Sequence, residues 1–226
     1  MPITLRSHQE PLVETFLAAL SQGQACADGS ETGVGKTFVS SRLARAWAEL
    51  GPVTYRKPFQ TGVEGAEDPL ADATMIGGAG ISAESHILLR EPLSPLAAAR
   101  REARTLDLQA ARLWCLRSAE GRVLLEGVGG LMVPLAPQVH FLAWATELKV
   151  PCVLVALGGL GTLNHTLLSA EALMLRGWRI EAVLLNPGAD GTVPEVAEAN
   201  AAILREFLPM PVYVLGAEAW NLKPDA

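Results

Sequence analysis

The sequence has little of what marks several functional classes. Cysteine is scarce, with Cys26, Cys115 and Cys152 far apart, so neither a disulfide framework nor a cysteine metal site is expected. The 4 histidines form no ligand pattern either. Acidic residues outnumber basic ones and give a formal net charge of −6. No basic stripe stands out, which argues against a nucleic-acid surface.

Long apolar runs are also missing. The longest, such as Val150–Leu157, have the length of a strand and are bounded by Gly or Pro, so no membrane-spanning helix is expected. A secretory signal is not expected, because no charged segment followed by an apolar one opens the chain. Apolar residues still make up 50% of the 226 residues, enough for a large core. These features predict a cytoplasmic protein that binds neither nucleic acid nor membrane.

Short runs rich in Val, Leu and Ile alternate with helical patterns along the chain. The runs are PVTYRKPF, RVLLEGVGG, PCVLVALGG, EAVLLNPG and PVYVLG, and helical spacing is found over 36–50, 100–119, 162–176 and 194–207. Several runs are apolar throughout, which is typical of strands buried on both faces of a parallel sheet. The alternation predicts an α/β fold with a doubly wound, mostly parallel central sheet flanked by helices. Ligands of such sheets bind at the carboxyl ends of the strands.

A Gly-rich loop, GSETGVGKT, extends from Gly29 to Thr37 and precedes a predicted helix. Glycines such as Gly33 and Gly35, with Val34 between them, let backbone N–H groups surround phosphate oxygens, and the helix adds its positive N-terminus. We expect Lys36 to reach the β- and γ-phosphates of ATP and Thr37 to bind Mg²⁺. The loop has five residues between Gly29 and Gly35, one more than the usual spacing.

The segment before this loop fits the pattern poorly. A P-loop follows an apolar strand, yet GQACADG is short and interrupted. We interpret residues 1–23, with helical spacing over 9–20, as an atypical N-terminal extension, and residues 24–226 as one P-loop α/β domain. The extension is loosely similar to the segment ahead of the P-loop in some helicases, but no helicase-type acidic box follows.

Two further strand ends carry charged groups. RKPFQTG places Lys57 and Thr61 at the end of a strand, where an ammonium group would neutralise a transferring phosphoryl group. LLEGVGGLMVP places Glu126 at the end of an apolar strand, where a carboxylate needs a partner, and Mg²⁺ is the natural one. Asp72 could be a second acid for the metal, or equally a helix cap.

Two later turns carry candidate binding groups for a substrate carboxylate and for adenine. GGLGTLNHTLLSAEAL is a turn onto an amphipathic helix with Asn164 in its first turn, where free N–H groups could hold a substrate carboxylate. A plain strand-to-helix turn explains it equally well. Asn186 ends the run AVLLN, and its amide suits an adenine edge or the capping of a strand.

In their order along the chain, these blocks resemble dethiobiotin synthetase over about residues 26–217. EGVGG with its following VP, and LNHTLLS, are the most specific blocks, and the family's P-loop has the same five-residue gap. The resemblance implies a cytosolic homodimer with active sites at the dimer interface. It also implies an ATP- and Mg²⁺-dependent ligase that converts 7,8-diaminononanoate and CO2 into dethiobiotin.

The resemblance also implies roles for individual residues. Thr32, Lys36 and Thr37 would contact phosphate and Mg²⁺. Lys57 and Thr61 would lie around the carbamate and the γ-phosphate. Asp72 and Glu126 would bind the metal, and Asn186 would contact adenine. Gly216, which ends PVYVLG, is counted with the nucleotide-binding residues. Gly161, Thr162, Leu163 and Asn164 would form the carboxylate clamp that one subunit offers to the other.

This sequence departs from the family pattern at a few positions. Ser94-Pro95-Leu96 replaces the usual Ser-Pro-His, and Ser30 and Glu31 replace the usual Thr and Asp. Three alternatives stay open at this stage: a partitioning-type ATPase switch, an amidotransferase synthetase of cobyrinic acid type, and an inactive P-loop homologue. Glu31 stands where the switch proteins carry a second lysine, and 226 residues leave no room for a glutaminase domain.

Overall fold

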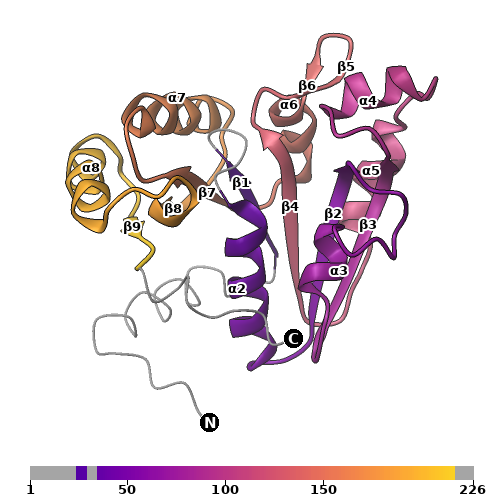
Figure 1. Ribbon diagram of the computed structural model, residues 1–226, viewed down its shortest axis with the longest axis horizontal. Helices are drawn as coiled ribbons and strands as arrows, with labels where there is room; N and C mark the ends of the chain where they lie inside the picture. The colour runs from indigo at the N-terminus through magenta and orange to yellow at the C-terminus, as the bar shows by residue number, and fades with distance from the viewer. Residues whose placement is uncertain (1–23, 30–34, 217–226) are drawn as a thin grey trace.

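The computed structural model describes residues 24–29 and 35–216, in which seven strands form one sheet (Figure 1). Every strand pairing in this sheet is parallel. The strands follow the order β3 (Ile81–Leu89), β2 (Val53–Thr61), β4 (Arg122–Gly130), β1 (Gln24–Gly29), β7 (Cys152–Leu157), β8 (Ile180–Asn186) and β9 (Val212–Val214). A separate antiparallel hairpin pairs β5 (Pro134–Ala136) with β6 (Val139–His140).

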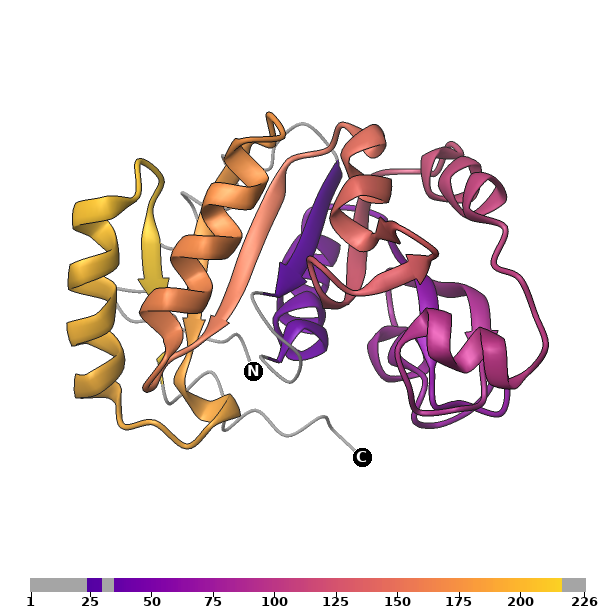
Figure 2. The same cartoon turned by 90° about the horizontal axis from the view of Figure 1, so that it is seen from above.

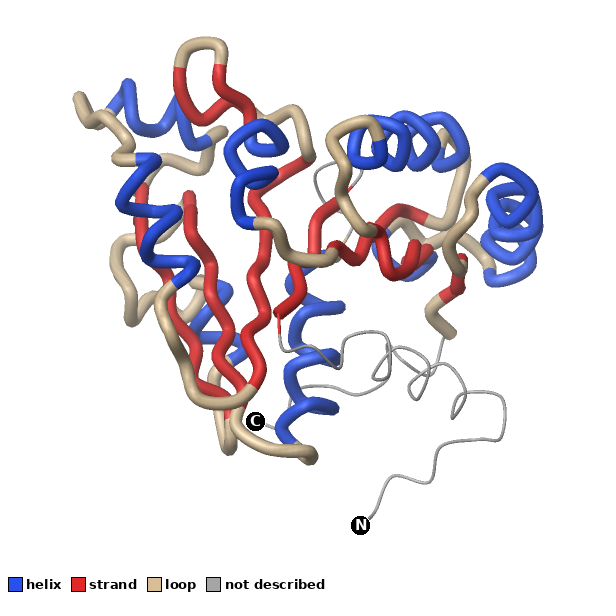
Figure 3. The backbone as a smooth tube through the Cα atoms, turned by 180° about the vertical axis from the view of Figure 1, so that it is seen from behind, coloured by secondary structure: helices blue, strands red, loops and turns tan. Residues whose placement is uncertain are grey.

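Helices cover both faces of the sheet (Figures 2 and 3). One face packs against α2 (Lys36–Ala48) and α3 (Asp72–Ile76). The other packs against α4 (Pro95–Arg101), α5 (Leu108–Leu116), α6 (Phe141–Ala145), α7 (Thr162–Met174) and α8 (Pro194–Phe207). Along β4, Leu124 points into the α2 core while Val123 and Leu125 point into the opposite core, as strand alternation requires. The predicted doubly wound parallel fold is confirmed.

The first strand corrects an expectation. The run before the P-loop looked too short and interrupted to be a strand, yet Gln24–Gly29 is β1, in the middle of the sheet between β4 and β7. Its backbone pairs with β4 from Gln24 to Gly29 and with β7 from Cys26 to Gly29. Two ladders of backbone hydrogen bonds therefore define this strand, although its sequence lacks the apolar run by which a buried strand is predicted. The predicted helical segment 9–20 lies outside the described residues.

The expected helix over 100–119 is wrong in one respect: it is two helices. The chain leaves α4 at Arg101, and Ala103 adopts a left-handed conformation with φ 52°. The second helix, α5, then begins at Leu108, and Asp107 caps it by accepting a 2.8 Å hydrogen bond from the backbone N–H of Ala110. A capping aspartate inside a helical pattern marks this restart.

The predicted ranges 36–50, 162–176 and 194–207 correspond to α2, α7 and α8, and α8 matches Pro194–Phe207 at both ends. The short helices α3 and α6 were not predicted. The edge strand β3 was not predicted, because its polar first half, ISAES, lacks the apolar run of a buried strand. No helix in the described ranges 24–29 and 35–216 is both long enough and apolar enough to cross a membrane.

Candidate active site

The described end of the Gly-rich loop meets the end of β8. Gly35 precedes α2 with φ 81°, a left-handed conformation that glycine adopts without strain. A Cβ atom there would lie 2.2 Å from Nδ2 of Asn186, which is fully buried. Asn186 therefore ends its strand as predicted and lies against the P-loop. The predicted phosphate contacts Thr32, Gly33 and Val34 lie outside the described residues.

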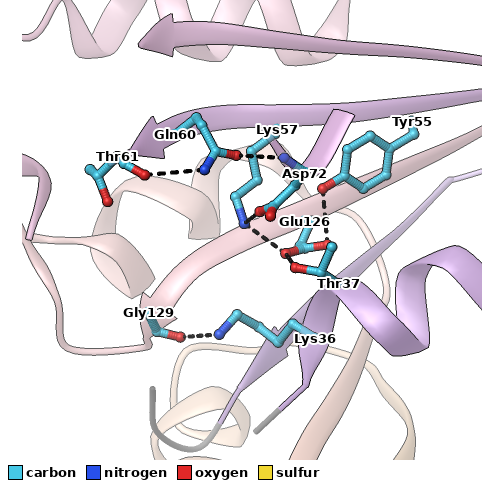
Figure 4. Close-up of polar contacts among 9 residues, drawn as sticks. All are labelled: Lys36, Thr37, Tyr55, Lys57, Gln60, Thr61, Asp72, Glu126 and Gly129. Atoms are coloured by element: carbon cyan, nitrogen blue, oxygen red, sulfur yellow. Dashed lines mark hydrogen bonds and ion pairs between the residues drawn. The ribbon is translucent and has the colours of Figure 1, made fainter. Parts of the chain in front are cut away.

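The P-loop lysine points across the sheet toward β4. Lys36 is the first residue of α2, and its Nζ donates a 2.6 Å hydrogen bond to the carbonyl oxygen of Gly129 (Figure 4). Gly129 is itself left-handed, with φ 60°. The helix start and the carboxyl end of β4 thus meet at one edge of the sheet, where ligands of this fold bind.

Four predicted residues meet in one polar cluster (Figure 4). Lys57 Nζ lies 2.6 Å from Glu126 Oε1 and 2.6 Å from Asp72 Oδ2. Thr37 Oγ1 donates to the same Glu126 oxygen at 2.9 Å. The side chains come from α2, β2, α3 and β4, so only the folded chain assembles them.

Two members of this region were not predicted. Tyr55 OH donates a 2.9 Å hydrogen bond to Glu126 Oε2, and Gln60 Oε1 accepts one of 3.2 Å from the backbone N–H of Asp72. The Nε2 of Gln60 also donates to the carbonyl oxygen of Thr61, 3.2 Å away. Tyr55 could have been found, because it lies two residues before Lys57 and alternation puts both on one face of a strand.

Burial makes the electrostatics of this cluster strong. Glu126 is 1% exposed and Lys57 6%. Burial alone would raise the pKa of Glu126, but the ammonium groups of Lys57 and Lys36 and the Thr37 hydrogen bond outweigh it and lower the pKa. Burial alone would lower the pKa of Lys57, but Glu126 and Asp72 outweigh it and raise the pKa. Both groups are therefore held in their charged forms.

The pKa values of two neighbouring acidic groups, Asp72 and Tyr55, are raised, whereas that of Glu126 is lowered. Burial, with the nearby charge of Glu126, raises the pKa of Asp72 although Lys57 opposes the rise. Burial and the Glu126 carboxylate raise the pKa of Tyr55 well above its usual value, so its hydroxyl stays protonated as a donor. The pKa of Glu126 is therefore lowered and that of Asp72 raised, although both carboxylates pair with Lys57.

The positions of these residues refine the sequence interpretation. Lys57 and Glu126 were expected at strand ends, but β2 continues to Thr61 and β4 to Gly130. Of the two interpretations of Asp72, the helix cap is wrong. Ala71 occupies the N-cap position of α3 without a side-chain cap, and the Asp72 carboxylate pairs with Lys57 instead.

The residues predicted for the substrate carboxylate begin α7. Gly161 is the N-cap, with φ 92°, and Thr162 turns inward to donate a 2.7 Å hydrogen bond to the carbonyl oxygen of Leu157. Asn164 is exposed and Leu163 half-buried. The helix start follows β7, which β1 separates from β4 of the Lys57 cluster in the strand order of the sheet. Gly216 is exposed and follows β9.

The oxygen atoms of the cluster fit a magnesium ion. Lys57 bridges the carboxylates of Asp72 and Glu126, and the Thr37 hydroxyl lies 2.9 Å from the latter. Carboxylates and hydroxyls are the hard oxygen donors that Mg²⁺ prefers, with phosphate oxygens and waters completing its coordination. Among the residues that the structure describes, no group of three or more His, Cys, Asp or Glu side chains could hold a metal ion alone.

Known proteins match the chain over most of its length. A family model described as an AAA domain matches residues 28–218. The chain is 41% identical over 213 residues to an ATP-dependent dethiobiotin synthetase of Mycolicibacterium vanbaalenii, covering 88% of this chain and 92% of the relative. It is 39% identical over 176 residues to that of Chlorobaculum tepidum, covering 73% of each. The chain belongs to the dethiobiotin synthetase family. The predicted resemblance is confirmed.

Solved structures agree on the fold. Cell division protein FtsY of Thermotoga maritima is similar with a TM-score of 0.51 at 18% identity, covering 96% of this chain and 73% of FtsY. The cell division ATPase MinD of Pyrococcus furiosus gives 0.51 at 17% identity, covering 84% of this chain and 81% of MinD. Both likenesses show the P-loop fold alone. The partitioning-type switch is not favoured for this chain, because the relatives at 39% and 41% identity are ATP-dependent dethiobiotin synthetases.

Proposed function

We propose that this chain closes the ureido ring of dethiobiotin by phosphorylating a carbamate beside Lys36, Lys57 and Glu126. The observation that carries the proposal is the 2.6 Å pairing of Lys57 with both Glu126 and Asp72, beside Thr37 at the start of the P-loop helix. ATP-dependent dethiobiotin synthetases are the relatives that cover most of the chain, and biotin biosynthesis is the pathway that their activity serves.

The reaction has three bond-making steps. A neutral amine of 7,8-diaminononanoate attacks CO2 and, after losing a proton, becomes a carbamate. A carbamate oxygen then attacks the γ-phosphorus of ATP, the bond from that phosphorus to the bridging oxygen breaks, and ADP leaves. The second amine attacks the carbamate carbon and loses a proton, the ring closes, and phosphate leaves with the electron pair of its C–O bond. The steps consume ATP and release ADP and phosphate.

The charged residues act on the phosphoryl step. Lys36 and Lys57 place ammonium groups where charge spreads over the transferring oxygens, and such preorganised groups supply most of the acceleration in phosphoryl transfer. In this proposal the Lys36 ammonium moves from the Gly129 carbonyl to phosphate when ATP binds, a short displacement because α2 is already in place. Thr32 and Thr61 are proposed to contact phosphate and carbamate. Asn186 and Gly216 are proposed to contact the adenine part.

Mg²⁺ is proposed to be held by Thr37, Asp72 and Glu126, where it would neutralise charge on the β- and γ-phosphates. The raised pKa of Asp72 supports this division of roles. A carboxylate that is harder to ionise in the protein alone gains its charge when a cation binds beside it. Glu126 stays ionised and keeps Lys57 in position.

A homodimer with active sites at its interface is part of the proposal. The Gly161–Asn164 helix start lies across β7 and β1 from the Lys57 cluster, so it is suited to serve the site of a second subunit. Leu160, beside it, is fully exposed, and Leu168 on α7 is largely exposed. An interface with a second subunit would remove these apolar side chains from water. Cytoplasmic location, which the scarcity of cysteine favours, completes the proposal.

ADP release tests the proposal directly. We expect ADP and dethiobiotin to form in equal amounts only when diaminononanoate, bicarbonate, Mg²⁺ and ATP are all present. Lys36→Ala should abolish both products and leave the circular dichroism spectrum unchanged. ADP release that ignores diaminononanoate would instead indicate a plain ATPase. Sedimentation at micromolar concentration tests the dimer, and a fully active monomer would contradict the shared site.

A further inference from the structure

The segment 186–192 lies between two parts of the proposed site. At its start, Asn186 and Ala189 lie over Gly35 at the N-terminus of α2. A Cβ atom at Gly35 would lie 2.2 Å from Asn186 Nδ2 and 3.9 Å from Ala189 Cβ. The segment between them is a 3-10 turn, η2 (Pro187–Ala189), which leaves little slack in the backbone.

The same segment also packs on the turn that leads from β7 to α7. A Cβ atom at Gly158 would lie 2.8 Å from Pro187 Cα, and one at Gly159 would lie 2.4 Å from Thr192 Oγ1. Real Cβ contacts are essentially never this short, so glycine at position 158 allows the two backbones to approach, and glycine at position 159 leaves room for the Thr192 and Asp190 side chains. Gly35 at the end of the P-loop and the turn before α7 therefore both contact this one short segment.

Asp190 and Asn200 hold this turn by hydrogen bonds. Asp190 Oδ2 accepts from the backbone N–H of Gly159 at 3.1 Å, while Oδ1 accepts from that of Thr192 at 3.0 Å. From α8, Asn200 Nδ2 donates to the carbonyl oxygens of Gly158 at 2.7 Å and Gly159 at 3.3 Å. Side chains from two other elements thus engage both the N–H and the carbonyl group of Gly159.

We propose that Asp190 and Asn200 are positioning residues that couple the nucleotide site to the start of α7. The inference rests on the proposed function, in which Asn186 contacts the adenine part and Gly161–Asn164 hold the substrate carboxylate at the other subunit's site. Binding of nucleotide against Asn186 fixes the near end of the 186–192 segment, and Asp190 transmits that constraint to Gly159. The occupancy of one active site then sets the substrate affinity of the other, and linkage makes the effect reciprocal.

Hydrogen exchange of the full-length dimer tests this coupling with ADP and Mg²⁺ as the probe. In the unaltered protein, ADP should slow exchange of the backbone amides of residues 159–165 by about fivefold or more, the lower end of common coupling strengths. Asp190→Ala removes both acceptors and should abolish most of that change. Asn200→Asp keeps the shape, replaces the donor by an acceptor and should do the same. Glu206→Gln, at an exposed position on the same helix, is the matched control and should retain the full effect.

Steady-state kinetics separates positioning from mere stability. Asp190→Ala and Asn200→Asp should raise the KM for diaminononanoate by about tenfold at saturating ATP. By linkage, they should weaken ATP binding by a similar factor when diaminononanoate is present, while kcat changes by less than about twofold. If Asp190→Ala does not fold, Asp190→Asn, which keeps an acceptor, should show a smaller rise. Uniform loss of all parameters would overturn the proposal.

The exchange measurement does not depend on the assigned substrate. An unaltered protein that forms no dethiobiotin but shows the ADP-dependent protection would refute the proposed function and support the coupling. Protection that is missing in the unaltered protein, or fully kept in Asp190→Ala, would refute the coupling while leaving turnover intact.

Discussion

Lys57 Nζ lies 2.6 Å from the Glu126 carboxylate, and both side chains are buried. Their pairing joins β2 to β4, which are neighbours in the sheet, at the level where Thr37 enters from α2. A buried pair of this kind is costly to break by removing one partner, because the other is left as an uncompensated charge. The pair therefore links the stability of the sheet to the ammonium group that is proposed to neutralise phosphate.

Glu126→Gln should separate ATP binding from turnover. The amide keeps the size of the side chain but removes its charge, so Lys57 and the proposed Mg²⁺ ion both lose a charged partner. Turnover should fall about a hundredfold or more, the scale of one lost electrostatic group, while the affinity for ADP changes little. Single-turnover kinetics and calorimetric ADP titration measure the two quantities. A mutant with an unaltered rate would show that Glu126 is only a structural acid.

Asp72→Asn should shift the magnesium requirement. The substitution removes the carboxylate whose pKa burial raises, and Lys57 keeps Glu126 as its partner. The Mg²⁺ concentration for half-maximal rate should rise about tenfold or more, the scale of a lost metal contact, and saturating Mg²⁺ should restore most of kcat. Asp68→Asn is the matched control, because its carboxylate is exposed and accepts hydrogen bonds only from the backbone N–H groups of Glu64 and Leu70 in the described contacts. Equal Mg²⁺ curves for the two variants would remove Asp72 from the metal site.

Stability should decline in alkaline solution from about pH 10. The folded-state pKa values of Tyr55 and Lys57 are raised above 10.0 and 10.5. Their contributions are present below those values and are lost as pH rises, because the unfolded chain releases protons that the folded chain retains. Urea midpoints between pH 8 and pH 11 measure the loss. Each such group adds a slope of about 1.4 kcal/mol per pH unit once its unfolded form has lost the proton.

Tyr55→Phe tests how much Tyr55 contributes to the loss of stability with rising pH. The variant should lose about 1–3 kcal/mol at pH 8, since buried Glu126 Oε2 loses its donor. Above pH 10 its stability should decline less steeply than that of the unaltered protein. Tyr213→Phe, on the half-buried edge strand β9, controls for the loss of a tyrosine hydroxyl. An equal change of slope in both variants would contradict the role of Tyr55.

Gly35→Ala should block nucleotide binding without unfolding the sheet. The new Cβ atom would lie 2.2 Å from Asn186 Nδ2, at a residue with φ 81°. Gly177→Ala is the matched control, because its φ of 72° imposes a similar strain and nothing lies within 4 Å of the added atom. Both variants should lose comparable stability, about 1 kcal/mol or more. ADP affinity should fall only in Gly35→Ala, and calorimetric titration can establish this.

The sequence predicts most of the fold because each buried strand and amphipathic helix carries its own pattern. RVLLEGVGG corresponds to β4 from Arg122 to Gly130 without adjustment. The central strand β1 and the edge strand β3 are the exceptions, for opposite reasons. Two neighbouring ladders define β1 although its residues are small and polar, while β3 has an apolar pattern only in its second half.

The site is predictable where a motif carries it and not where tertiary packing does. Lys36, Thr37, Lys57 and Glu126 each stand in a recognisable block, and the structure brings them together. The roles of Gly129 and Asp190 have no such signal, since each depends on a backbone group of a segment distant in sequence. No spacing rule relates residues that are 31 or 93 positions apart in the sequence. These residues meet only because the folded chain brings two distant segments together.

The position of β1 affects the order in which the molecule can be completed during synthesis. The strand that leads into the phosphate loop leaves the ribosome before the other described strands, yet its neighbours begin only at Arg122 and Cys152. Until β4 has emerged, β1 has neither of its sheet partners, and its backbone groups are open to incorrect pairing. Pairing across such sequence distances is slow. We therefore expect nascent chains that end before residue 130 to bind no ATP and to require chaperones, with nucleotide binding appearing only after β7 has been made.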